Sequence, residues 1–200
     1  MKLVAGLDEV GRGALAGPLV LCLVEIDDNL SINGIPKGVT IRDSKKMTRI
    51  QRSSSFEYIK KVAKRIDIEV VSVSSINDMG IGKCNHYGFE KLIGSSLSDS
   101  FIVDGNLKFE DTRVKSIIKA DSLYLPVMMA GIVAKVTRDK IMKDLHLLDN
   151  RYCWNKNVGY GTLEHLRSID RYGKTKHHRD LFVKTAMSNF RSSLNPSNAF

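Results

Sequence analysis

The sequence has few cysteines and no long apolar run, and these two shortages exclude several classes of protein. Its three cysteines, Cys22, Cys84 and Cys153, are odd in number, far apart and without a CxxC pair. This rules out a disulfide framework and a cysteine zinc site, and it is typical of a reducing compartment. The longest uninterrupted apolar stretch, residues 127–134, is far too short to cross a bilayer. We therefore expect a cytoplasmic protein that does not associate with membranes.

Repeats and linkers are also missing, and the composition is that of an ordinary globular domain. With 200 residues, of which 42% are hydrophobic, the chain can bury a full core. We expect a single catalytic domain over residues 1–190, acting as a monomer. The segment 191–200 is rich in Pro, Asn and Ser, so we expect it to fray.

The net charge of +9 lies entirely in the second half of the chain. Residues 1–112 carry 15 Lys or Arg and 15 Asp or Glu, whereas residues 113–200 carry 16 against 7. A basic excess confined to one part of a protein favours a polyanionic partner, because neutralising phosphates releases counterions. Nucleic acid is the partner that this distribution favours, although a basic surface with no ligand remains the alternative.

The hydrophobic pattern predicts an α/β fold with a helical, basic C-terminal part. The expected strands are 2–7, 19–26, a weak one near Val39–Ile41, 68–73, 101–103 and 114–118. One helix is expected to begin at Thr48. Four more are expected over residues 76–93, 126–148, 162–172 and 180–190.

Four acids lie where predicted strands end or helices begin. Asp8 and Glu9 close the first strand, Asp104 closes strand 101–103, and Asp121 precedes the long apolar helix. Converging strand ends would bring these carboxylates to one edge of the sheet. Clustered carboxylates repel unless a cation neutralises them, and oxygen ligands without Cys or His favour Mg²⁺ or Mn²⁺. Two such ions promote phosphodiester hydrolysis, so a nuclease is the natural hypothesis.

Each acid also has a purely structural interpretation. Asp104 precedes a glycine and could be an ordinary turn residue, and Asp121 could cap a helix. Asp8 and Glu9 would face opposite sides of a regular strand, so both can serve one site only if the strand ends or bulges there. Two consecutive acids at the end of an apolar strand are, however, hard to explain by stability.

Three other motifs do not support a function. Gly11, Gly13 and Gly17 have the spacing GxGxxxG and precede a predicted strand, whereas a dinucleotide loop needs GxGxxG before a helix. The segment 173–175 resembles the end of a P-loop but lacks the upstream glycine. The histidines His165, His177 and His178 have no zinc spacing, and we expect them to contact phosphates instead.

Several segments together resemble the type 2 ribonucleases H, the ribonuclease HII family. The resemblance rests on Gly6–Gly13 (GLDEVGRG), Ala16-Gly17-Pro18, Asp43-Ser44-Lys45-Lys46, Val103–Asn106 (VDGN), Lys119-Ala120-Asp121, Ile132–Asp139 (IVAKVTRD), Gly159–Thr162 (GYGT) with His165, and His178-Arg179. These segments follow the family order and span residues 3 to about 185.

The resemblance implies a ribonuclease H-like fold, with a five-stranded mixed sheet flanked by helices and further helices over the substrate. It implies a metal-dependent endonuclease that cleaves the RNA strand of RNA–DNA hybrids and incises 5′ of single ribonucleotides in duplex DNA. The products would carry a 3′-hydroxyl and a 5′-phosphate, formed by two-metal-ion activation of water with Mg²⁺ or Mn²⁺. A catalytically weak hybrid-binding protein is the alternative that the basic half alone would support.

The family's functional residues fall on positions of this chain. The carboxylates that bind metal and catalyse are Asp8, Glu9, Asp104 and Asp121. The substrate-binding residues are Gly11, Arg12 and Gly13, which would sense the RNA–DNA junction with Tyr160, together with Ser44, Lys45, His165 and Arg179. One departure is Ala130-Gly131, where many members have Ala-Ser. We expect it to affect helix stability and one substrate contact, and to leave the metal site unaffected.

Overall fold

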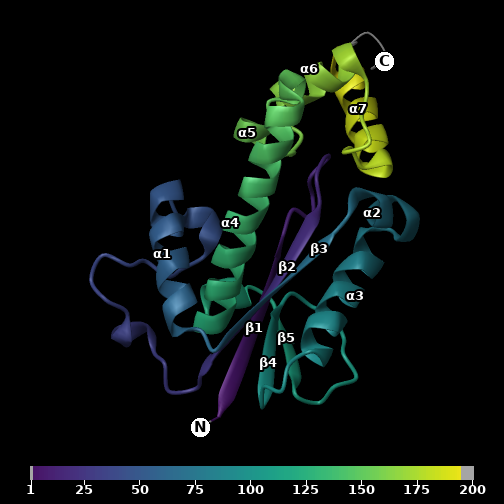
Figure 1. Ribbon diagram of the computed structural model, residues 1–200. Coiled ribbons are helices and arrows are strands. Elements are labelled where there is room, and N and C mark those ends of the chain that lie inside the picture. The colour runs from purple at the N-terminus through teal and green to yellow at the C-terminus, as the bar shows by residue number, and fades with distance from the viewer. Residues whose placement is uncertain (1, 195–200) are drawn as a thin grey trace.

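A computed structural model describes residues 2–194 of the chain (Figure 1). Its strands are β1 (Leu3–Val10), β2 (Leu19–Asp27), β3 (Arg65–Val71), β4 (Ser100–Asp104) and β5 (Val114–Ile117). Its α-helices are α1 (Arg49–Val62), α2 (Val73–Met79), α3 (Ile81–Gly94), α4 (Leu125–Leu148), α5 (Trp154–Asn157), α6 (Leu163–Tyr172) and α7 (Asp180–Leu194). Short 3₁₀ helices are η1 (Ile32–Gly34), η2 (Ser44–Lys46), η3 (Ala120–Ser122) and η4 (Asn150–Tyr152).

The five strands form one mixed sheet in the order β3-β2-β1-β4-β5. β1 pairs antiparallel with β2 and parallel with β4, while β3 and β5 form the two edges. The predicted five-stranded mixed sheet is thus confirmed. β1 lies at the centre, so residues at its C-terminal end are positioned by neighbours on both sides.

Helices cover both faces of the sheet. One face packs a core of Val20, Cys22 and Val24 against α1 and α4, and the other packs Leu7, Leu21 and Leu23 against α3. Figure 1 shows α4 rising past the sheet, with α5, α6 and α7 gathered around its upper end. A third core around Trp154 and Tyr152 fills that end of the molecule.

Three details differ from the sequence-based expectations. The weak strand near Val39–Ile41 is wrong: these residues form a loop that starts with a turn from Pro36, with Ile41 buried in the core. The helix expected over 76–93 is two helices, because Gly80 adopts φ +82° between them. α7 extends to residue 194, into the segment expected to fray, and residues 195–200 of that segment lie outside the described residues.

No helix among residues 2–194 has the length and apolarity needed to cross a membrane.

Candidate active site

The central strand β1 brings the first acid next to the third. Leu7 pairs with Val103 of the parallel strand β4, so the next residues of the two strands, Asp8 and Asp104, lie side by side. Asp104 is the last residue of β4, as the sequence predicts. The expectation that Asp8 and Glu9 close their strand is wrong by one residue, because β1 continues regularly to Val10.

A regular strand sends Asp8 and Glu9 to opposite faces of the sheet. Asp8 lies on the face of α4 and is 4% exposed, and its Oδ1 accepts a hydrogen bond of 2.7 Å from the Glu9 backbone N–H. The Glu9 carboxylate lies 3.7 Å from the guanidinium of Arg12, in the following loop. β1 has no bulge and ends one residue after Glu9, so both acids lie near the strand end that the sequence analysis gave as one of two conditions for a shared site.

The fourth acid, Asp121, comes from the turn between β5 and α4. Lys119 adopts a left-handed conformation with φ +62°, and the 3₁₀ helix η3 follows directly. Asp121 is 9% exposed there, and its Oδ2 accepts a hydrogen bond of 3.2 Å from Lys45 Nζ. α4 begins after Tyr124 without a side-chain cap, so Asp121 does not act as its N-cap.

Burial and mutual repulsion make these carboxyl groups easier to protonate than usual. Burial raises the pKa of Asp8 well above its usual range, and the charges of Glu9 and Asp104 raise it further. Burial also raises the pKa of Glu9 to about 7, although Arg12 opposes the shift. The pKa of Asp104 is raised by burial and then by the charge of Asp121. Burial is the largest cause of all three shifts, so a cation bound beside these carboxyl groups would favour their ionised form.

Two carboxylate oxygens at this edge have the properties expected of metal ligands. Glu9 Oε2 and Asp104 Oδ1 are buried and have no hydrogen-bond partner, and buried polar atoms are normally satisfied. Oxygen ligands of this kind suit Mg²⁺ or Mn²⁺. Within residues 2–194, no three His, Cys, Asp or Glu side chains are placed so that they could hold a metal ion together. The fit to a divalent cation therefore rests on the oxygen chemistry of these acids and on the two buried atoms without a partner.

Gly131 of α4 contacts this set of acids. A Cβ atom on Gly131 would lie 2.3 Å from Asp8 Oδ2, a distance that two such atoms cannot adopt. The missing side chain thus makes room for the Asp8 carboxylate. Gly131 thus lies against a proposed metal ligand, so its packing against Asp8 bears on the expectation that the metal site is unaffected, which stays a prediction.

The predicted junction-sensing residues lie on two loops that are bonded to each other. Gly11, with φ +98°, opens the loop after β1, and Arg12 and Gly13 follow it. The backbone N–H groups of Leu15 and Ala16 both donate to Gly159 O, at 2.8 and 3.2 Å. Tyr160, the next residue, is 36% exposed. The structure therefore brings Tyr160 to the loop that begins next to the carboxylates.

The remaining predicted substrate contacts divide into one exposed group and three buried ones. Lys45 has a side chain that is 68% exposed; burial lowers its pKa, but the charges of Asp8 and Asp121 outweigh this and raise it. Ser44, His165 and Arg179 are 4%, 0% and 0% exposed. Of the four, only Lys45 lies open to a substrate.

Arg179 bonds to the protein backbone and not to solvent. Its guanidinium donates to Gly17 O at 2.9 and 3.0 Å and to Arg12 O at 3.0 Å, and burial lowers its pKa to about 10. The structure thus replaces the expected substrate contact of Arg179 with support for the loop after β1. No local pattern predicts this role, because the carbonyl partners lie more than 160 residues away along the chain.

The expected phosphate contacts of His165 and His178 are wrong, because these side chains form a buried pair. Their Nε2 atoms lie 3.2 Å apart. His165 Nδ1 must donate to Tyr160 O, at 2.9 Å, so its Nε2 is an acceptor and also accepts from Trp154 Nε1. His178 Nδ1 accepts from the Thr175 backbone N–H, so its Nε2 carries the hydrogen that links the pair. This arrangement requires both rings to be neutral.

We expect the neutral histidine pair to make the protein sensitive to acid. Burial lowers the pKa of both rings, that of His178 to about 4, whereas an unfolded histidine titrates near its usual value of 6.5. As the pH falls from 6.5 towards 4, the unfolded chain takes up the proton first, so the free energy of unfolding decreases. His178 alone should contribute a loss of about 2 kcal/mol between pH 7.5 and 5.

Urea unfolding at both pH values measures this loss, with His178→Asn as the matched variant. Asparagine retains an acceptor for the Thr175 N–H but cannot be protonated. The variant should lose less stability than the native protein on going to pH 5. Equal losses in the two proteins would show that His178 is not the titrating group.

Comparisons with known proteins agree with this site. The family model described as ribonuclease HII matches residues 5–189. Ribonuclease HII of Wolbachia pipientis wMel is 45% identical over 184 residues, covering 90% of this chain and 89% of the relative. The crystal structure of ribonuclease H2 from Pyrococcus horikoshii OT3 superposes with a TM-score of 0.71 and 25% identity, covering 94% of this chain and 99% of that one.

A third similarity, to the fold alone, is to Bst-RNase HIII in complex with Mn²⁺. Its TM-score is 0.67 at 21% identity, covering 94% of this chain and 70% of that one. The match of the family model over nearly the whole chain, with the acids at one edge of a mixed sheet, leads to one conclusion. The chain belongs to the ribonuclease HII family of metal-dependent endoribonucleases.

Proposed function

We propose that the protein cleaves the RNA strand of RNA–DNA hybrids and incises duplex DNA on the 5′ side of a single embedded ribonucleotide. The observation that carries this proposal is the contact between the two loops, in which Leu15 and Ala16 donate to Gly159 O. It joins a loop that begins two residues after the Asp8–Glu9 pair to the loop of Tyr160. Chemistry and selection of RNA can therefore operate on adjacent nucleotides.

Asp8, Glu9, Asp104 and Asp121 are the residues that would bind the cations. Bound there, two ions of Mg²⁺ or Mn²⁺ supply an activated water and stabilise the leaving oxygen. The structural neighbour solved with Mn²⁺ makes that ion one of the two to test. The Lys45 ammonium is hydrogen-bonded to Asp121, but its side chain is 68% exposed, so a substrate phosphate can approach it.

Selection of RNA requires contact with the 2′-hydroxyl, which DNA lacks. Gly13 is exposed, and no atom lies within 4 Å of where its Cβ would be. Its backbone groups are thus open to a sugar at the scissile position, whereas Gly11 is buried at the base of the loop. Tyr160 adds an exposed aromatic ring that can stack on the neighbouring deoxyribose.

The proposal is tested on an end-labelled DNA duplex that contains one ribonucleotide, with an all-DNA duplex as the matched control. In Mg²⁺ or Mn²⁺, the labelled product should end on the 5′ side of the ribonucleotide, and a DNA polymerase should extend its 3′-hydroxyl. The all-DNA duplex and a reaction with EDTA should stay intact. Tight binding to hybrids without cleavage in either metal would favour the hybrid-binding alternative.

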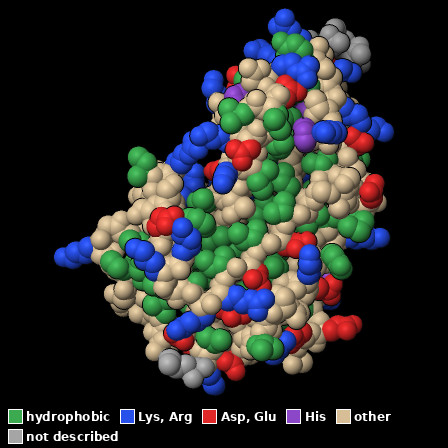
Figure 2. Space-filling view, viewed as in Figure 1, with side chains coloured by type: hydrophobic (Ala, Val, Ile, Leu, Met, Phe, Trp, Pro, Cys, Tyr) green, Lys and Arg blue, Asp and Glu red, His purple; other side chains and the backbone are tan. Residues whose placement is uncertain are grey.

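The basic C-terminal helices provide a second contact with nucleic acid. Figure 2 shows Lys and Arg side chains gathered over the end of the molecule formed by α6 and α7. Lys176 is exposed before α7, and Lys174 Nζ lies 2.6 Å from Asp180 with half of its side chain exposed. A phosphate backbone crossing this end would meet both lysines.

We therefore expect the double variant Lys174→Ala/Lys176→Ala to bind hybrids with a weaker dependence on salt. The slope of log Kd against log salt should fall by about 0.9 for each lysine that contacts a phosphate. Fluorescence anisotropy between 50 and 200 mM salt, roughly the range over which such slopes are measured, checks this. Lys60→Ala/Lys61→Ala, in the last turn of α1, is the control of equal charge. An unchanged slope in the first variant would mean that this end faces away from the substrate.

A further inference from the structure

The loop that presents Tyr160 contains a strained residue. Val158 adopts φ +44° and ψ +34°, the left-handed conformation, and Gly159 follows with φ +85°. A β-branched residue rarely adopts this conformation, because its side chain crowds the backbone. Such strain persists only where the surrounding structure imposes it, and it is concentrated at functional sites.

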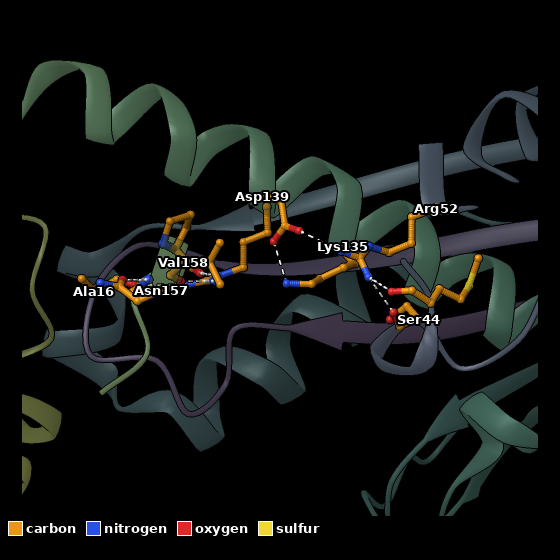
Figure 3. A network of polar contacts seen from close by, with 11 residues as sticks. Ala16, Ser44, Arg52, Lys135, Asp139, Asn157 and Val158 are labelled. Carbon is orange, nitrogen blue, oxygen red and sulfur yellow. Dashed lines mark hydrogen bonds and ion pairs between the residues drawn. The ribbon is translucent and has the colours of Figure 1, made fainter. Parts of the chain in front are cut away.

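The side chain of Arg138, in the middle of α4, holds Val158 in this left-handed conformation through a hydrogen bond to its backbone. Arg138 is fully buried, and its NH1 donates to Val158 O at 2.8 Å. Its Nε and NH2 donate to Pro18 O and Ala16 O, at 2.9 and 3.0 Å. Figure 3 shows this end of the polar network, with Ala16, Asn157 and Val158 drawn together. One guanidinium thus bridges the loop after β1 and the loop of Tyr160.

Two further contacts fit the guanidinium closely to the residues proposed to read the substrate. The Arg138 guanidinium lies over the Tyr160 ring, 5.5 Å from its centroid. On the other side, a Cβ on Gly11 would lie 2.1 Å from Arg138 Nε, so only a glycine can pack there. No ion pair found within residues 2–194 joins Arg138 to an acid. Burying a charge without an acid partner is costly, so stability alone does not account for this residue.

Asn157 fixes the same loop from its other side. Its Oδ1 accepts a hydrogen bond of 2.8 Å from the Gly159 N–H, and its Nδ2 donates to Tyr152 O at 2.7 Å. Its backbone O accepts from the Tyr160 N–H at 2.9 Å. Tyr160 therefore has a backbone held by Asn157 and a ring face covered by Arg138.

We propose that Arg138 is a positioning residue that sets the separation between the Gly11–Gly13 loop and Tyr160, and thereby the preference for a single embedded ribonucleotide. The inference rests on the proposed function, in which those two elements read the RNA–DNA junction. A continuous hybrid offers a 2′-hydroxyl at every position, so a small displacement of Tyr160 costs little there. A lone ribonucleotide must instead lie in contact with the Gly11–Gly13 loop while Tyr160 contacts its neighbour.

The test is the conservative variant Arg138→Lys, which keeps the charge but cannot bridge three carbonyls with a planar fork. The kcat/KM for the single-ribonucleotide duplex should fall roughly 10- to 100-fold, the range expected when an aromatic stacking contact is lost. On a continuous hybrid, kcat/KM should change much less. Equal losses on both substrates would reduce Arg138 to a structural residue and overturn the proposal.

The neighbouring residue Asp139 provides the matched control. Asp139 lies 2.7 Å from Lys135 Nζ and 3.7 Å from Arg52, whose NH1 donates to Ser44 O at 3.0 Å, and Figure 3 shows this as the other end of the network. It supports the Ser44–Lys45 segment near Asp121, and no hydrogen bond or ion pair found within residues 2–194 joins its side chain to the Tyr160 loop. Asp139→Asn should therefore affect both substrates by the same factor. A selective loss in this variant would also overturn the proposal.

Two more variants separate this inference from the proposed function. If Arg138→Lys fails to fold, Asn157→Ala displaces the same loop. Its kcat/KM should fall more on the single-ribonucleotide duplex than on the continuous hybrid. Equal losses on the two substrates would overturn the proposal here as well. The double variant Arg138→Lys/Tyr160→Ala should have the same ratio of kcat/KM for the single-ribonucleotide duplex to kcat/KM for the continuous hybrid as Tyr160→Ala alone. Arg138 acts through the tyrosine, so its replacement should have no further effect on that ratio once the tyrosine is gone. Multiplying losses would overturn the inference and leave the proposed function intact. Unchanged selectivity in Tyr160→Ala alone would instead refute the junction reader itself.

Discussion

Asp8→Asn is expected to abolish cleavage while leaving the protein folded. Asparagine retains the oxygen that accepts from the Glu9 N–H, so the local backbone contact is kept. It removes the charge next to Glu9 and Asp104, on which cation binding depends. We expect kcat to fall by at least about a thousandfold in Mg²⁺, because activation of water and stabilisation of the leaving group are lost together.

The stability of this variant is as informative as its activity. In the metal-free protein, burial and two neighbouring charges disfavour ionised Asp8, as its raised pKa shows. A neutral asparagine avoids that cost, so the free energy of unfolding at pH 8 should equal or exceed that of the native protein. Added Mg²⁺ should stabilise the variant less than it stabilises the native protein.

The matched control is Asp28→Asn. Asp28 is an exposed acid just beyond β2 and is not one of the four active-site acids. Its activity should remain native in a single-turnover cleavage assay with a continuous hybrid. Binding of the hybrid should persist in both variants, since the basic helices are untouched. Cleavage by Asp8→Asn within about tenfold of the native rate would remove Asp8 from the catalytic group.

The acids could be predicted from the sequence because each follows a recognisable strand or precedes a recognisable helix. Asp104 comes directly after a short apolar strand, and parallel pairing with β1 then places it next to Asp8. The sheet was predictable for the same reason, apart from Val39–Ile41. There a turn at Pro36 and Gly38 outweighs the strand propensity of three β-branched residues.

The supporting residues could not be predicted, since nothing local distinguishes a buried arginine from an exposed one. Arg138 and Arg179 both donate to backbone carbonyls of residues 12–18, more than 100 residues away, and Arg138 also donates to Val158 O. In the sequence they are simply two more cations in a basic half. The contact of Gly131 with Asp8 was equally hidden, because only the packing of α4 on β1 defines it. One available signal was the pair of small residues Ala130-Gly131, which permits close packing of a helix.

Tyr160→Ala is expected to change the choice of substrate more than the chemistry. Tyr160 is 36% exposed, and the Arg138 guanidinium covers one face of its ring. The opposite face is therefore the one available for stacking on a nucleotide. Losing one stacking contact should lower kcat/KM for a single embedded ribonucleotide by roughly 10- to 100-fold. The carboxylates lie on other elements and are unchanged, so cleavage of a continuous hybrid should fall by less than about fivefold.

Tyr160→Phe separates the ring from its hydroxyl. Phenylalanine retains the stacking face and the packing on Arg138, so this variant should remain within about threefold of the native enzyme on both substrates. The ratio of the two kcat/KM values is the decisive quantity, because any general loss of folded protein cancels in it. If alanine lowers both values by the same factor, Tyr160 is a packing residue of its loop. If phenylalanine behaves like alanine on the single ribonucleotide alone, the junction is read by the hydroxyl group and not by the ring. Selection would then depend on a hydrogen bond to the sugar and not on stacking.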